Sequence, residues 1–147
     1  MSRGARAGEL DREALLAALV IAPATYSRNR FFELYQDPDV YRIRRRASQI
    51  RSIVRHVTRV DPAQAGERVR FAPAGGDRVE LSYAVPALAL RRTALLDPIE
   101  LSLVRFAMAR GARGPAGPPP DDPDRLRVEA ALARLAPRPA DAREAPL

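Results

Sequence analysis

The chain has 147 residues, no cysteine and a single histidine, and its formal net charge is +7 at pH 7. All 25 of its basic residues other than histidine are arginine, because the sequence contains no lysine. These counts exclude disulfides, cysteine nucleophiles, lysine Schiff bases and lysine-containing phosphate-binding loops. The positive charge favours a polyanionic partner, although an arginine-only composition rich in alanine and proline is also typical of a GC-rich genome.

The first predicted element is a helix over residues 9–22, which follows a flexible N-terminus of residues 1–8. Apolar side chains, mainly alanine and leucine, cover nearly the whole circumference of this helix, which is typical of a buried element. Pro23 ends the helix. Acidic residues precede the apolar run, where a signal peptide needs positive charge, so we expect a core helix in a cytoplasmic protein. No apolar run reaches the ~20 residues that a transmembrane helix needs.

Aromatic residues and arginines are concentrated in residues 26–60. We expect a short helix that ends at Tyr35 and then a long amphipathic helix that begins at Asp37-Pro38 and ends before Asp61-Pro62. Apolar side chains recur every three or four residues along the long helix and predict its buried seam: Val40, Ile43, Ala47, Ile50, Val54 and Val57.

The outer surface of the long helix is covered by arginine. Arg44, Ser48, Arg51 and Arg55 fall on one line along it. The candidate anion-binding residues on this helix and on the hairpin that follows are Arg42, Arg44, Arg45, Arg46, Arg51, Arg55, Arg68, Arg70 and Arg78. Tyr35 and Tyr41 are candidates for stacking on bases, because they lie beside arginines.

Two alternating runs predict a β-hairpin over residues 68–84, with a turn rich in glycine and proline between them. Residues 86–96 show no clear period, and Arg91-Arg92 indicates an exposed bend. Asp97-Pro98 starts a further helix with Glu100 at the capping-box position, and Gly111 is its expected stop. The body, residues 9–111, is therefore predicted to be α+β, with one hairpin and, together with the C-terminal helix, about five helices.

The C-terminal quarter of the chain, residues 112–147, is predicted to be tethered to this body. Residues 112–121 are rich in proline and glycine and resemble a linker, residues 122–136 form a helix with a thin apolar stripe, and residues 137–147 are disordered. The sequence leaves open whether this helix docks on the body or binds a partner.

No residue pattern predicts catalysis. His56 with Asp61 or Glu67 could transfer a proton, but a structural histidine near a helix C-terminus explains His56 more simply. Helix capping likewise explains Asp37 and Asp39 better than metal binding does. We therefore expect no catalytic site, no metal site and no cofactor.

The order of two helices, a long basic helix and a hairpin resembles a winged helix-turn-helix, in which the long helix enters the DNA major groove. We therefore expect a non-enzymatic binding protein whose arginine surface contacts an anionic partner, with nucleic acid as the first candidate. The alternative is an interaction adaptor that docks an acidic protein through the C-terminal helix and the basic surface. A third possibility is an amphipathic helix lying on an anionic membrane, which requires the apolar seam to be exposed.

Overall fold

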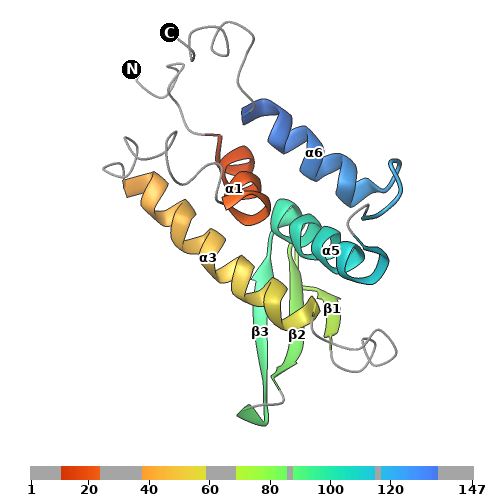
Figure 1. Cartoon of the computed structure of the whole chain (residues 1–147). Coiled ribbons are helices and arrows are strands. Elements are labelled where there is room, and N and C mark those ends of the chain that lie inside the picture. Colours follow the sequence, from red (N-terminus) through yellow and green to blue (C-terminus); the bar gives the residue numbers. More distant parts are fainter. Residues whose placement is uncertain (1–10, 24–37, 59–68, 86–87, 115–116, 136–147) are drawn as a thin grey trace, which may run out of the picture.

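The computed structural model describes residues 11–23, 38–58, 69–85, 88–114 and 117–135. Their elements in chain order are α1 (Arg12–Ile21), α3 (Pro38–Thr58), β1 (Val69–Pro73), β2 (Val79–Val85), β3 (Leu90–Leu96), α5 (Pro98–Arg113) and α6 (Pro123–Leu135). The described residues thus form four helices and one three-stranded antiparallel sheet, an α+β fold (Figure 1). The short helix predicted to end at Tyr35 and the termini predicted to be flexible lie outside the described residues.

Side-chain caps set the starts of the helices. The carboxylate of Asp11 accepts a hydrogen bond from the Ala14 N–H at 3.1 Å, which satisfies a donor that α1 itself leaves unpaired. At the start of α5, Asp97 accepts from the Glu100 N–H and Glu100 accepts from the Asp97 N–H, both at 2.9 Å. The capping box predicted at this position is therefore confirmed.

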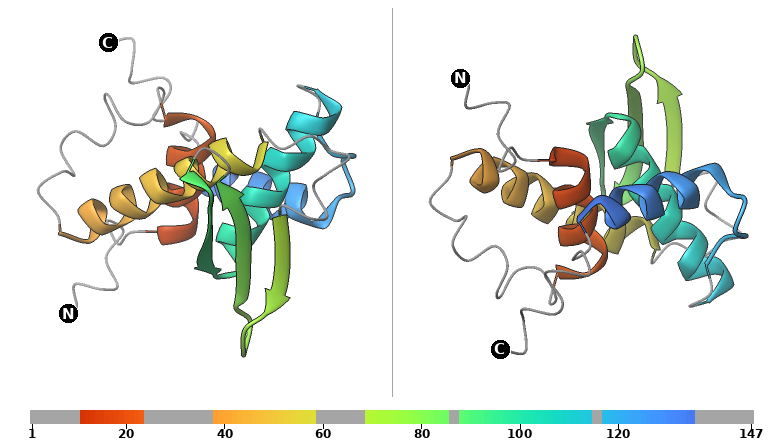
Figure 2. Two further views of the ribbon diagram at one scale, coloured as in Figure 1. Left: turned by 90° about the horizontal axis from the view of Figure 1, so that it is seen from below. Right: turned by 90° about the horizontal axis from the view of Figure 1, so that it is seen from above.

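The sheet has the order β1-β2-β3, and both strand pairs are antiparallel. Its inner face packs against α3 and α5 (Figure 2). Cross-strand partners such as Val69 and Tyr83 place their side chains on the same face. The side chains that this face buries are Val69, Leu81, Tyr83, Val85 and Leu96.

A third strand corrects the prediction of an isolated hairpin. β3 pairs with β2 along its whole length, from Leu90 opposite Val85 to Leu96 opposite Val79. The expected bend at Arg91-Arg92 is wrong, because both arginines lie within this strand. Its sequence lacks a period of two because β3 is an edge strand in which only the last of seven side chains is buried. The winged-helix resemblance, which was expected from the order of two helices, a long basic helix and a hairpin, is not confirmed.

The helix α5 extends beyond its predicted stop. Gly111 lies inside it, and the helix continues to Arg113 before Gly114 caps it. Gly114 has a φ of +93°, and its N–H donates to the Arg110 carbonyl at 2.8 Å. The two glycines look alike in sequence, but of the pair only Gly114 has the positive φ that favours glycine at a helix end.

The C-terminal helix α6 is docked on the body. It packs against α1 and α5, at the opposite end of the molecule from the sheet (Figure 1). Val128 and Ala131 on its inner side have 0% and 1% of their surface exposed and belong to the same core cluster as α1, α3 and α5. Arg134 Nε also binds Asp11 Oδ2 at 2.6 Å, which links α6 to the cap of α1. In the predicted apolar stripe of α6, Val128 and Ala131 are thus buried, and Leu132 and Leu135 are partly buried against the core. The first residues of the predicted linker belong to α5, which ends at Arg113.

Candidate functional site

The long helix α3 is held by its apolar seam. The seam packs against α1, α5 and β2. The opposite side of α3 faces solvent. The buried residues are Val40, Ile43, Ala47, Ile50, Ile53 and Val57. Val54, which the sequence places in the seam, is only partly buried, and Ile53 takes its place. With the seam buried in this way, Arg42, Arg45 and Arg55 are exposed on the outer side of α3, and Arg44 and Arg51 are partly exposed.

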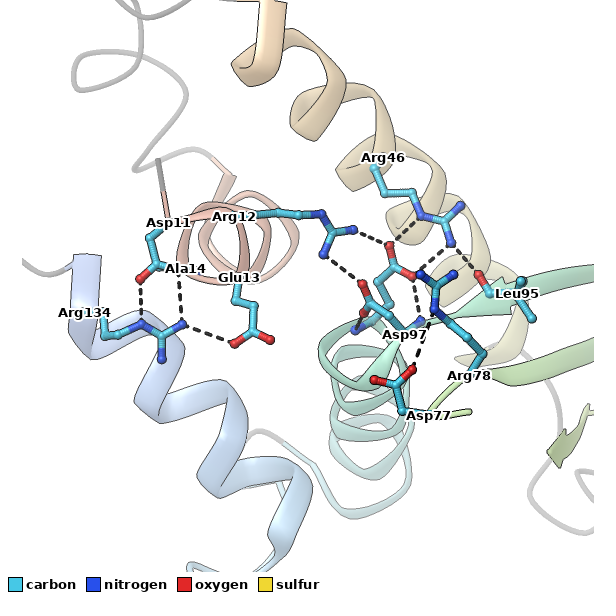
Figure 3. A network of polar contacts seen from close by, with 11 residues as sticks. Asp11, Arg12, Glu13, Ala14, Arg46, Asp77, Arg78, Leu95, Asp97 and Arg134 are labelled. Atoms are coloured by element: carbon cyan, nitrogen blue, oxygen red, sulfur yellow. Dashed lines mark hydrogen bonds and ion pairs between the residues drawn. The ribbon is translucent and has the colours of Figure 1, made fainter. Parts of the chain in front are cut away.

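Arg46 is a structural residue rather than part of the outer surface. Its Nε and Nη2 bind the two carboxylate oxygens of Glu100 at 2.7 and 3.1 Å, and Nη2 also donates to the Leu95 carbonyl at 2.7 Å. Arg12 from α1 reaches the same Glu100 at 2.8 Å (Figure 3). This network joins α1, α3, β3 and α5, so the prediction that Arg46 contacts a partner has no support in this geometry.

Glu100 at the centre of this network is only 3% exposed. Burial alone raises the pKa of its carboxyl, because desolvation disfavours the charged form. Hydrogen bonds from Arg46, the Asp97 backbone N–H and Arg12 outweigh burial, and the pKa lies below the ordinary value of a glutamate. The charged form of Glu100 therefore stabilises the fold.

Three predicted arginines converge on an open cavity of about 300 Å³ between α1 and α3. The described residues that line it are Leu19, Pro23, Arg44, Arg45, Ser48 and Arg51. Three members of the line predicted from the sequence, Arg44, Ser48 and Arg51, thus reach one cavity. Arg55, the fourth member, is exposed on α3 and is not among the lining residues.

Two of the cavity arginines are oriented by the fold. Arg51 Nη1 donates to the Leu19 carbonyl at 3.0 Å and so satisfies one of the last carbonyls of α1. The guanidinium carbon of Arg45 lies 5.9 Å from the centre of the Tyr41 ring, within cation–π range. Tyr41 itself is 55% exposed, as a stacking residue requires, whereas Tyr35 lies outside the described residues.

The remaining predicted arginines are dispersed. Arg42 forms an ion pair with Asp39 one turn earlier on α3. Arg70 is exposed on the sheet, and Arg68 is outside the described residues. In the turn before β2, Arg78 Nε lies 3.9 Å from Asp77 Oδ1. Of the predicted arginines that the structure describes, Arg44, Arg45 and Arg51 line one cavity, and Arg42, Arg55, Arg70 and Arg78 are not among its lining residues.

Sequence reasoning missed two groups of residues. The apolar wall of the cavity is formed by Leu19 of α1 and by Pro23, which follows α1, and no pattern in the sequence indicated their role. Arg91 and Arg92 were expected in a bend, but they are exposed on β3, where Arg91 Nε donates to Ser82 Oγ at 3.0 Å. A prediction of β3 as an edge strand would have placed them on the same sheet as Arg70.

His56 has structural contacts. Its Nδ1 lies 2.8 Å from the Ser52 carbonyl one turn earlier, so Nδ1 carries the proton of this hydrogen bond. Its ring centre lies 5.8 Å from that of Tyr83 on the inner face of the sheet. Asp61 and Glu67, its proposed partners in proton transfer, lie outside the described residues. Within the described ranges no group of three potential metal ligands occurs.

No protein-family model, curated protein or solved structure matches this chain. Among the helices that the structure describes, none combines the length and the apolar character needed to cross a membrane.

Proposed function

We propose that this chain is a non-enzymatic binding protein that contacts an anionic partner, nucleic acid in the first place, through the arginine surface of α3. The observation that carries the proposal is the cavity between α1 and α3, on which Arg44, Arg45 and Arg51 converge. Guanidinium groups bind phosphate oxygens through paired N–H donors, and they keep their charge at any physiological pH.

Two further features support nucleic acid. The net charge of +7 attracts a polyanion at long range. Beside the cavity, the exposed ring of Tyr41 lies next to Arg45, and such a pair suits the stacking of an unpaired base. We propose a cytoplasmic setting because nucleic acid is available there.

The structure leaves fewer surfaces for the alternative function, an adaptor that docks an acidic protein. This alternative relied on the apolar stripe of α6 as a docking surface, but Val128 and Ala131 are buried against α1 and α5. What remains for this alternative is contact between the basic surface of α3 and an acidic protein. Such contact predicts no affinity for nucleic acid beyond the general attraction between a basic chain and a polyanion.

Binding to a fluorescently labelled random duplex, measured at about 50 and 200 mM salt, tests the proposal. We expect affinity to fall steeply with salt, because binding to phosphates releases counterions. The double variant Arg44→Ala, Arg45→Ala should reduce the slope of log affinity against log salt by about 0.9 for each phosphate that the variant no longer neutralises.

The matched control is Arg127→Ala, which removes an exposed arginine from α6, away from the cavity. It should leave the slope nearly unchanged. Absence of binding by the wild-type chain at low salt would rule out nucleic acid and favour the acidic protein.

A further inference from the structure

The cavity between α1 and α3 is a half-open hollow rather than a flat basic surface. Among the described residues that line it, the charged ones are all arginines, with one serine hydroxyl beside them. We infer that this cavity is a specific pocket for a phosphate monoester, either the terminal phosphate of a nucleic acid strand or a small phosphorylated compound. This inference rests on the proposed function and assigns a ligand class to the same site.

The charge of the lining suits a dianion. Each guanidinium offers five N–H donors and no acceptor, and the Ser48 hydroxyl adds a donor that can rotate. Within the described part of the chain, neither Arg45 nor Arg51 forms an ion pair with a carboxylate, and no described lining residue is acidic. A phosphate monoester carries about −1.5 to −2 charges at pH 7 and three terminal oxygens, whereas a backbone diester carries one charge and two such oxygens.

The size of the cavity points to the same ligand. A volume of about 300 Å³ lies at the small end of the range for ligand pockets, roughly 300–1,000 Å³. It accommodates one phosphate with a small attached group rather than a length of strand. Leu19 and Pro23 supply an apolar wall for the carbon side of the ester.

The pocket is also organised before the ligand arrives. The bond from Arg51 to the Leu19 carbonyl fixes one guanidinium at the end of α1, and the Tyr41 ring lies beside the guanidinium of Arg45. Holding long side chains in place before binding reduces the entropy that binding must otherwise lose.

The test is calorimetric titration of the full chain with three probes: inorganic phosphate, a short single-stranded oligonucleotide, and the same oligonucleotide with a 5′-phosphate. We expect saturable binding of inorganic phosphate with one site. If the source is nucleic acid, the 5′-phosphorylated strand should bind about tenfold more tightly than the unphosphorylated one, as expected for one additional charge-assisted contact. If the source is a free compound, phosphate should bind without any preference between the two strands.

Three variants assign the binding to the pocket. Arg45→Ala should weaken phosphate binding about tenfold, and Ser48→Asp, which places a carboxylate in the cavity, should abolish it. Arg55→Ala removes an equal charge from the same helix outside the cavity and should change phosphate binding less than about twofold. Both Ser48 and Arg45 are exposed, so the folded state should tolerate these changes, and circular dichroism can verify this.

Failure of the inference differs from failure of the proposed function. If inorganic phosphate does not bind and the two strands bind equally, while duplex DNA still binds, the pocket is wrong and the proposed function stands. If phosphate binds in the pocket but duplex DNA does not bind at low salt, the pocket stands and the nucleic-acid proposal is wrong. An equal loss in Arg55→Ala and Arg45→Ala would overturn the pocket, because only general charge would then matter.

Discussion

Replacement of Glu100 by glutamine should lower the free energy of unfolding by about 3 kcal/mol, the low end of the cost of breaking a buried ion pair. The Glu100 side chain is 4% exposed and binds Arg46 and Arg12, whose side chains are 29% and 43% exposed. The variant leaves both guanidiniums without their carboxylate, although their partial exposure limits the cost. Urea denaturation followed by circular dichroism measures the change, and a fall in Tm of roughly 6–12 °C should accompany it.

The matched control is Glu129→Gln. Glu129 pairs with Arg125 on the surface of α6 and its side chain is 52% exposed, so the destabilisation should stay below about 0.5 kcal/mol. Equal destabilisation in both variants would show that the network contributes no more than an exposed pair does.

The stability that Glu100 provides should also depend on pH. Because the pKa of Glu100 in the folded state is lowered, its contribution to the free energy of unfolding is complete above the ordinary glutamate pKa of about 4.3. This contribution disappears as pH falls through the lowered pKa.

Replacement of Ala131 by aspartate should destabilise the chain by about 3 kcal/mol or more, or prevent folding. Ala131 is 1% exposed, in the core that α6 shares with α1 and α5. An aspartate there either buries a charge or pushes α6 off the body, and both outcomes cost free energy. Urea denaturation and limited proteolysis of the purified variant measure the effect.

Ala130 provides a control on the same helix, because the neighbouring residue is exposed. Ala130→Asp should cost only the difference in helix propensity, about 0.6 kcal/mol. If Ala131→Asp were equally mild, α6 would not be docked, and the tethered helix predicted from the sequence would be correct.

The starts of α5 and α6 could be predicted because their signals are local, whereas the short helix expected to end at Tyr35 lies outside the described residues. The pairs Asp97-Pro98 and Asp122-Pro123 mark the starts of α5 and α6, and the Glu100 capping box forms as expected. The strand β3 could not be predicted in this way. Its side chains are mostly exposed, so no period of two appears, and the segment becomes a strand through its pairing with β2.

The candidate site was predicted in part. Helical periodicity alone placed Arg44, Ser48 and Arg51 on one line, and all three line the cavity. Periodicity could not separate them from Arg46, because the role of Arg46 depends on Glu100, 54 residues later in the chain. Interactions of this kind arise from the packing of α3 against α5, which local sequence does not reveal.

Nitrogen-15 NMR of the arginine side chains, with a duplex oligonucleotide added stepwise, tests the central claim most directly. The Nε–H signals of Arg44, Arg45 and Arg51 should shift progressively with DNA, because these side chains line the cavity. The signal of Arg46, which is held by Glu100, should remain in place. Shifts confined to arginines elsewhere, or no shift at low salt, would contradict the account.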